Sequence, residues 1–254
     1  MQIIGHRGAM WDAPENTLVS FAMGWEQEAD IVECDIRLTA DGRIVTIHDA
    51  TTGRTAGVDL EVAKTTSDEL RQLDFGRFKG EQFAGEKIPF LEEVLEMIPP
   101  RRKLFVEIKC GTEVLPHLKR IIQESGKAES VVLIGFDLDV VTQAKRLMPE
   151  REVYWLRTTP KDASGNWVEY DPKIVEIVAE HGLDGPNLHY AGLTADLAEA
   201  VRAAGQKLYV WVVNEPELAL RLMEMGVDGL GTDRPGWLRK QLHPQPGEQA
   251  TEAV

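Results

Sequence analysis

The sequence predicts a single α/β domain folded as a (β/α)8 TIM barrel, with an extra antiparallel hairpin strand and a small insertion after it. The chain has 254 residues, close to the roughly 250 typical of such barrels. Short apolar runs alternate along it with amphipathic stretches, as in parallel sheets whose strands are joined by helices. Eight of these runs are separated by predicted helices, which favours a closed barrel over an open sheet.

The first elements are a strand over residues 2–5 and a helix over residues 17–28. Leu18 and Trp25 recur at the spacing of one helix face. Asn16 carries a side chain suited to capping the start of this helix. The segment is therefore predicted to form the first strand–helix unit of the barrel.

A hairpin is predicted next. A strand over residues 30–38 leads to Asp41-Gly42, a dipeptide that favours a tight two-residue turn, and a second strand follows over residues 43–48. A parallel pair of strands would need a crossover of a dozen or so residues. The strand over residues 43–48 must therefore run back antiparallel beside its predecessor.

Residues 50–90 interrupt the alternation and are rich in Thr, Gly and charged side chains. A connection this long predicts a small inserted loop or subdomain, with a short helix over residues 67–72. Residues 1–242 are predicted to form the domain, and the polar tail 243–254 is expected to be disordered. The remaining strands are predicted over residues 104–108, 131–135, 153–156, 183–187, 208–213 and 226–231, and the remaining helices over residues 90–98, 114–124, 138–147, 172–181, 194–204, 215–224 and 236–242.

The hairpin is predicted to place a histidine beside two carboxylates. A two-residue turn would pair Asp35 with His48, and a four-residue turn would pair Glu33 with His48. Side chains alternate along a strand, so all three share one face in either register, whereas a three-residue turn would break the pattern. Two carboxylates on one face of a mostly apolar strand are costly unless they meet a cation.

Charged residues also end two other predicted strands. His6 and Arg7 follow the first strand, and Glu107 and Lys109 stand two residues apart where the third parallel strand ends. Active sites of (β/α)8 barrels are built where strands end and loops begin. These side chains are therefore expected to meet the carboxylates and the histidine of the hairpin at one mouth.

The residue types at this mouth indicate metal-assisted phosphate chemistry. Carboxylates are hard oxygen ligands that suit Mg²⁺ or Ca²⁺, so one divalent ion is expected. Arginine binds phosphate oxygens as a fork and lysine as a point charge, and two histidines can work as acid and base near neutral pH. The candidates are Glu33, Asp35 and Glu107 for the metal, His6 and His48 for acid–base catalysis, Arg7 and Lys109 for phosphate, and Trp211 for contact with substrate carbon.

Composition limits the partners of the protein. The formal net charge is −14 at pH 7, which argues against nucleic acid and against electrostatic docking on an anionic membrane. Two cysteines do not make a disulfide framework, and no window approaches the ~18 apolar residues of a membrane span. The N-terminus has no secretory signal pattern. We therefore expect a cytoplasmic protein with a small-molecule substrate, and we leave its oligomeric state open.

Seven short segments, in this order and spacing, resemble the signature of the glycerophosphodiester phosphodiesterase family. The resemblance extends from residue 3 to about residue 238. One departure is the stretch 51–57, where relatives often carry a Leu-Asp-Arg-Thr-Thr-like run. The resembling segments are His6-Arg7-Gly8, Pro14-Glu15-Asn16-Thr17, Glu33-Cys34-Asp35, His48-Asp49, Glu107-Ile108-Lys109, Trp211-Val212-Val213-Asn214 and the block 226–235.

The resemblance implies an activity and the parts that carry it. Family members release sn-glycerol 3-phosphate and an alcohol, with a divalent metal on the three acidic positions and two histidines as general acid and base. It also implies that Glu15 supports the site from the first loop. The short insertion suits the small cytoplasmic bacterial type. Which histidine is the acid, and whether water or a substrate hydroxyl attacks, stays open.

Three alternatives compete with this interpretation. A phosphodiesterase of the same fold could act on a lysophospholipid, and four phenylalanines between residues 75 and 90 keep that option open. A non-catalytic binding barrel would be expected to lack part of the polar set, which here is complete. A metal-dependent sugar isomerase is a guess from fold alone, because barrels support many reactions.

Overall fold

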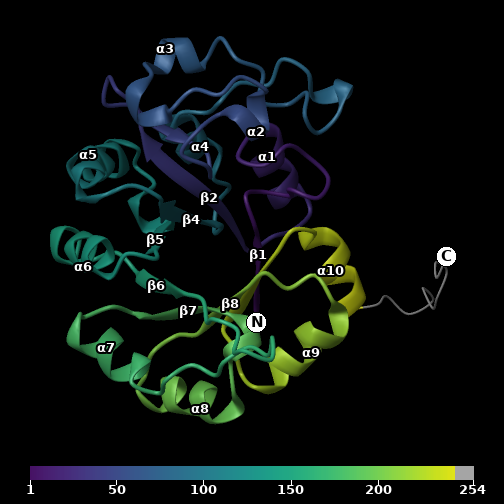
Figure 1. Cartoon of the computed structure of the whole chain (residues 1–254), viewed down its shortest axis with the longest axis vertical. Coiled ribbons are helices and arrows are strands. Elements are labelled where there is room, and N and C mark those ends of the chain that lie inside the picture. The colour runs from purple at the N-terminus through teal and green to yellow at the C-terminus, as the bar shows by residue number, and fades with distance from the viewer. Residues whose placement is uncertain (244–254) are drawn as a thin grey trace.

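The computed structural model describes residues 1–243. In this part of the chain nine strands form one sheet, and eight of them are parallel and close into a barrel because β1 pairs with both β2 and β9 (Figure 1). The predicted fold class is therefore confirmed. The predicted disordered tail, apart from His243, lies outside the described residues. The barrel strands are β1 (Gln2–Gly5), β2 (Ile31–Leu38), β4 (Lys103–Ile108), β5 (Val131–Gly135), β6 (Val153–Arg157), β7 (Gly185–His189), β8 (Tyr209–Trp211) and β9 (Gly229–Thr232).

Helices surround the barrel and cover its outer face (Figure 1). The amphipathic pattern explains why, since in the helix that begins at Leu115 one face, including Leu118 and Ile122, is buried against the strands. No helix within residues 1–243 is both long enough and apolar enough to cross a bilayer. The helices are α1 (Leu18–Glu26), α2 (Gly53–Ala56), α3 (Ser67–Leu70), α4 (Leu91–Met97), α5 (Leu115–Glu124), α6 (Leu138–Leu147), α7 (Ile174–Glu180), α8 (Ala195–Ala203), α9 (Pro216–Glu224) and α10 (Pro235–Leu242).

A second apolar cluster fills the inside of the barrel. The rings of Phe105, Tyr154 and Tyr209 pack on one another there, with centroid distances of 4.9 to 6.1 Å. Both tyrosine hydroxyls are satisfied, because Tyr154 donates to Glu152 and Tyr209 donates to Gln2. Burying each ring contributes roughly 1.5–3 kcal/mol. This packed layer forms the floor on which the polar site rests.

Residues 50–90 form a small insertion with apolar contacts of its own, drawn in blue at the top of Figure 1. Phe75 and Leu70 are buried there against Val45 and Ile47. Phe90 closes the insertion and carries the guanidinium of Arg43 on its ring, 3.9 Å from the centroid. Of the four phenylalanines that left a lipid substrate possible, Phe75 is buried, Phe83 and Phe90 are half-buried, and Phe78 is exposed.

The register predicted for the hairpin is wrong. β3 (Ile44–Thr46) pairs antiparallel with β2 so that Arg37 lies opposite Val45, and this register corresponds to the odd-numbered turn that breaks the predicted face-sharing. Continued in this register, His48 would point away from the face that carries Asp35. It does not, because β3 ends at Thr46 and the chain bends at His48. The bend, not strand alternation, turns the imidazole into the barrel.

Candidate active site

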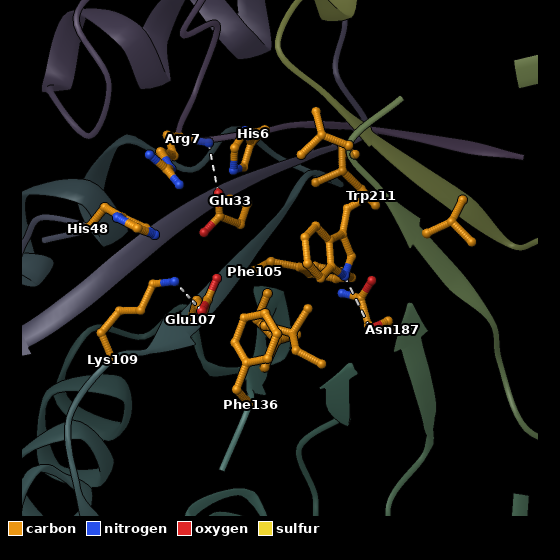
Figure 2. A pocket seen from close by; sticks show the side chains of 16 residues that line it. His6, Arg7, Glu33, His48, Phe105, Glu107, Lys109, Phe136, Asn187 and Trp211 are labelled. Carbon is orange, nitrogen blue, oxygen red and sulfur yellow. Dashed lines mark hydrogen bonds and ion pairs between the residues drawn. The ribbon is translucent and has the colours of Figure 1, made fainter. Parts of the chain in front are cut away.

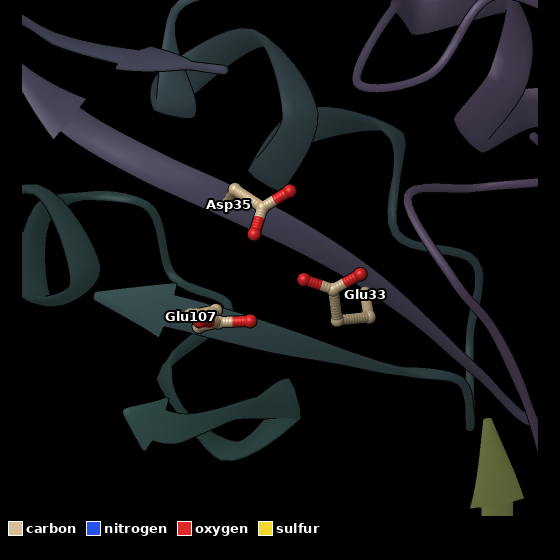
Figure 3. A group of neighbouring side chains, drawn as sticks. All are labelled: Glu33, Asp35 and Glu107. Carbon is tan, nitrogen blue, oxygen red and sulfur yellow. The ribbon is translucent and has the colours of Figure 1, made fainter. Parts of the chain in front are cut away.

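Three carboxylates meet at the mouth of the barrel, on two neighbouring strands. β2 and β4 pair in parallel with Asp35 opposite Glu107, and Glu33 stands two residues earlier on the same face of β2. One oxygen from each carboxylate lies within 4.8 Å of the others. Figure 3 shows all three projecting into the same space. The sequence-based expectation that these side chains gather is therefore matched by the geometry.

The three carboxylates are buried close to one another. All three residues are at most 8% exposed, and Glu33 Oε1 is buried without a hydrogen-bond or ion-pair partner among the described residues. The buried oxygens Asp35 Oδ1 and Glu107 Oε1 face the Lys109 ammonium. Burial and the charge of Asp35 raise the pKa of Glu33 well above its ordinary range and that of Glu107 to about 7. Buried carboxylates this close repel one another, and a bound cation offsets that repulsion. Hard oxygen donors suit Mg²⁺ or Ca²⁺. The residues therefore fit a divalent metal ion.

Two basic side chains border the carboxylates. Arg7 Nε lies 3.2 Å from Asp35, and its main-chain N–H donates to Glu33 at 2.7 Å. The Lys109 ammonium forms ion pairs with Asp35 and Glu107. Although burial opposes the shift, these charges lower the pKa of Asp35. Asp35 is therefore the carboxylate that stays ionised, and the two basic side chains are held at the lining of the pocket.

Each histidine of the mouth is oriented by a carboxylate. His6 Nδ1 lies 2.7 Å from Asp233, and His48 Nδ1 lies 2.7 Å from Asp49. Both carboxylates have pKa values below the ordinary range, so they stay ionised and each accepts a hydrogen bond from Nδ1–H. The neutral rings then carry their lone pair on Nε2. Figure 2 shows His6 and His48 on the side of the pocket that holds Glu33 and Glu107.

Glu15 supports this site through arginine. It is 8% exposed and accepts hydrogen bonds from Arg7 at 2.8 Å and from Arg54 at 2.6 and 2.8 Å. Arg54, on α2 of the insertion, also donates to Asp49 at 2.6 Å. Burial opposes the shift, but these contacts lower the pKa of Glu15. The insertion is thereby tied to the partner of His48.

Sequence reasoning missed several of these contributors. Asn16 does not cap α1, because Thr17 accepts that hydrogen bond. Instead, Asn16 donates to the Asp35 carboxylate at 2.8 Å and accepts from its main-chain N–H at 3.0 Å. Asp233, within the block 226–235, orients His6. Both stand inside the motifs already singled out, but their partners are distant in sequence.

The pocket has an apolar half beside the charged groups. Its volume is about 200 Å³, and Phe105, Phe136 and Trp211 line this half (Figure 2). Trp211 packs against Phe136 with ring centroids 5.6 Å apart and donates from its indole N–H to the carbonyl of Asn187 at 3.2 Å. Trp211 is thus placed to touch the carbon part of a ligand whose anionic end faces Lys109.

Every predicted site residue is found at or beside this pocket. Asp35 and Glu15 lie behind the surface, where they hold the basic side chains. The arrangement places three carboxylates, two basic side chains and two oriented imidazoles around one cavity, residue types that can together cleave a phosphate ester. The predicted residues that line the cavity are His6, Arg7, Glu33, His48, Glu107, Lys109 and Trp211.

Comparison with known proteins agrees with this chemistry. Residues 6–237 match the sequence model of the glycerophosphoryl diester phosphodiesterase family. The chain is 33% identical over 243 residues to the glycerophosphodiester phosphodiesterase of Caldanaerobacter subterraneus subsp. tengcongensis, covering 92% of this chain and 94% of that protein. Two solved structures are similar. One is an Oleispira antarctica phosphodiesterase in complex with its product sn-glycerol-3-phosphate, with TM-score 0.86, 28% identity and coverage of 95% and 96%. The other is a glycerophosphodiester phosphodiesterase from Agrobacterium tumefaciens, with TM-score 0.79, 25% identity and coverage of 94% and 98%.

Proposed function

This chain belongs to the glycerophosphoryl diester phosphodiesterase family, and on that premise we propose that it hydrolyses glycerophosphodiesters to sn-glycerol 3-phosphate and an alcohol in a metal-dependent reaction. Phosphodiester hydrolysis itself follows from the family. The metal requirement and the roles of individual residues are the finer part of the proposal.

One observation carries the metal requirement. Three buried carboxylates bring one oxygen each within 4.8 Å of the others, and Glu33 Oε1 has no partner among the described residues although Arg7 and Lys109 border the cluster. Glu33, Asp35 and Glu107 would hold the ion. When bound, a divalent cation supplies positive charge against the phosphoryl oxygens and offsets the repulsion among its ligands.

The charges of Arg7 and Lys109 bind the phosphodiester. Both side chains are about 15% exposed, so they meet a ligand in a partly desolvated site where electrostatic attraction is stronger than in water. Arg7 is fixed by Glu15 and Asp35, which limits its motion when the ester arrives. These preorganised cations stabilise the negative charge that develops on the phosphoryl oxygens.

The two histidines transfer protons. One imidazole takes a proton from the attacking nucleophile, either water or a hydroxyl group of the substrate, and the other gives a proton to the departing alkoxide. Each ring is suited to this because a carboxylate holds Nδ1 and leaves Nε2 toward the pocket. His6 depends on Asp233, and His48 depends on Asp49.

The proposal is tested by metal depletion. The protein is treated with chelator, Mg²⁺ or Ca²⁺ is added back separately, and release of glycerol 3-phosphate from glycerophosphocholine is followed. Activity should fall to background after chelation and return with at least one of the two ions. Undiminished activity in the chelated protein would remove the metal from the reaction.

A matched pair of variants tests whether Glu107 is a ligand of the metal. Glu107→Gln keeps the size of a proposed ligand and removes its charge, whereas Glu124→Gln makes the same change on the exposed face of α5. The first variant should not recover on metal addition, and the second should behave like the wild type. Equal recovery of both variants would contradict the assignment of Glu107.

A lysophospholipid is a second candidate substrate, and one observation favours it. One half of the cavity is apolar, and Phe136, whose ring centroid lies 5.6 Å from the Lys109 ammonium, is 39% exposed. Comparing hydrolysis of lysophosphatidylcholine with that of glycerophosphocholine decides between them, since only the first carries an acyl chain. A kcat/KM for the lysophospholipid no higher than for glycerophosphocholine would leave the water-soluble diester as the substrate.

A further inference from the structure

Arg37 occupies an unusual position behind the site. It lies on β2, two residues beyond Asp35, and its guanidinium reaches two other segments of the chain. Nε and Nη2 donate to the main-chain carbonyl of His48 at 3.0 and 2.8 Å, and Nη1 donates to the main-chain carbonyl of Lys109 at 3.0 Å. One side chain therefore forms hydrogen bonds to the backbone of two residues whose side chains line the pocket.

These two carbonyls lie where the sheet ends. β3 stops at Thr46 and β4 stops at Ile108. The main-chain N–H groups of Ile47 and Lys109 still donate to β2, but the carbonyls of His48 and Lys109 accept no main-chain hydrogen bond within residues 1–243. Without a partner, each carbonyl would leave its segment free to move. The guanidinium of Arg37 supplies the hydrogen bonds that these two carbonyls accept.

The contact is specific to arginine. Arg37 forms no ion pair with a carboxylate in residues 1–243, so its donors are committed to the two backbone segments. The guanidinium is planar and holds its donors in a fixed fork, which spans two acceptors at once. A lysine ammonium is a single point of charge and would reach one segment at a time.

We propose that Arg37 is a positioning residue that fixes the relative placement of His48 and Lys109 through their main chains. This inference rests on the proposed function, in which His48 transfers a proton and Lys109 binds the phosphate. Figure 2 shows these two side chains approaching the same region of the pocket from adjacent segments. A shift of about 1 Å between such groups can cost on the order of 10²-fold in rate.

A second cavity borders Arg37. Its volume is about 230 Å³, and Arg37 lines it together with Thr39, Glu61 and Cys110. Truncating Arg37 to alanine would join the vacated space to this cavity. Guanidinium or methylguanidinium ions from solution could then enter and bind the same two carbonyls.

The experiment compares Arg37→Ala and Arg37→Lys with Arg43→Ala. Arg43 stands on the same hairpin but stacks on Phe90 and pairs with Glu92, away from the pocket. We expect Arg37→Ala to lower kcat by ~10–100-fold, with KM changed less than about threefold. Arg37→Lys should lie between that variant and the wild type, and Arg43→Ala should keep wild-type kcat.

Two further readouts separate positioning from general stability. Millimolar methylguanidinium should raise kcat of Arg37→Ala several-fold and leave Arg43→Ala unchanged. Hydrogen–deuterium exchange in Arg37→Ala should rise in the segments around residues 47–49 and 109–111 and not throughout the barrel. If Arg37→Ala does not fold, Arg37→Lys takes its place in the kcat and exchange comparisons.

Specific results would overturn the proposal. Wild-type kcat in Arg37→Ala, or in Arg37→Lys if that variant replaces it, would do so. So would an equal loss in Arg43→Ala, or a loss that methylguanidinium does not relieve while exchange rises over the whole chain. If the wild type released no alcohol from any glycerophosphodiester, the proposed function would fail, yet the local exchange pattern would still decide whether Arg37 holds the two segments.

Discussion

At the scale of single residues, the mouth of the barrel is organised as pairs. His6 is paired with Asp233, His48 with Asp49, and each pair joins a ring to an ionised carboxylate at 2.7 Å. The carboxylate selects the tautomer and fixes the ring plane. An imidazole that is held in this way can exchange a proton at Nε2 without first reorienting.

Replacing either imidazole should reduce turnover while leaving the fold intact. His6→Ala and His48→Ala are each expected to lower kcat by ~10²–10⁴-fold, the range for one positioned acid or base. His117→Ala, on α5, is the control and should retain activity. Steady-state kinetics together with thermal melting measures this. Near-normal turnover in one variant would remove that histidine from proton transfer.

Removing the charge of Asp49 should shift the titration of His48. Burial lowers the pKa of His48, while the charge of Asp35 and the hydrogen bond to Asp49 raise it. Asp49→Asn removes one of the groups that favour the protonated ring, so the pKa of His48 falls further below its ordinary value. The limb of the pH–rate profile that follows His48 moves to lower pH with it.

Nuclear magnetic resonance of the His48 ring measures this directly. The titration midpoint of the metal-free Asp49→Asn protein should lie below that of the wild type, whereas Asp139→Asn, an exposed change on α6, should leave it in place. A midpoint that stays or rises in Asp49→Asn would show that Asp49 does not stabilise the protonated ring.

At the scale of elements, the β2–β3 hairpin determines how the insertion meets the barrel. Asp41 in its turn accepts hydrogen bonds from Thr39 at 2.6 Å and from the N–H and hydroxyl of Ser67 at 2.9 and 2.7 Å. Ser67 begins α3, so one carboxylate connects the hairpin to the insertion. The insertion in turn delivers Arg54 to Asp49 and Glu15.

Acid should weaken this connection. Against the opposing effect of burial, the hydrogen bonds from Thr39 and Ser67 lower the pKa of Asp41 to about 2. A depressed pKa means that the stabilisation is complete above the unfolded value of 3.8 and is lost as the pH falls through about 2.

Asp41→Asn should therefore lower the melting temperature at pH 7 by on the order of 2 °C. The difference from the wild type should shrink as the pH falls from about 4 toward 2, which melting or urea unfolding at several pH values measures. Asp68→Asn, an exposed change in α3, serves as control. A difference that stays constant with pH would contradict the role of the Asp41 charge.

At the scale of the whole molecule, closure of the sheet is what concentrates charge. The barrel brings β1, β2 and β4 together, so acidic and basic groups from residues 6 to 109 share one desolvated mouth above an aromatic floor. Like charges at this density destabilise the metal-free protein. A bound cation should therefore raise global stability as well as activity.

Thermal unfolding should report this coupling. At about 100 times the dissociation constant, a metal that binds only the folded state stabilises by ~2.7 kcal/mol, or roughly 5–11 °C in a chain of this size. Glu107→Gln should lose the shift and melt no lower than the metal-free wild type, because one repelling charge is gone. Glu124→Gln should keep the shift. A wild type that melts equally with and without the ion would contradict the metal site.

Much of this protein was predictable from the sequence, because the information is local. Alternation of apolar runs predicted the strands and helices, and the spacing of Glu33 and Asp35 placed both on one strand face. Positions just after strands selected His6, Arg7 and Lys109. These inferences need only the period of a regular element and the rule that barrel sites lie at strand ends.

The tertiary structure alone decided what depends on distant segments. The pairing of His6 with Asp233 joins residues 227 apart, and the contact of Asn16 with Asp35 overrides the capping role its neighbours suggested. The hairpin register differed because the turn takes an odd number of residues, and His48 reached the site by a bend instead. Such contacts depend on how loops close and where ladders stop, and those are properties of the assembled barrel, not of any short stretch of sequence.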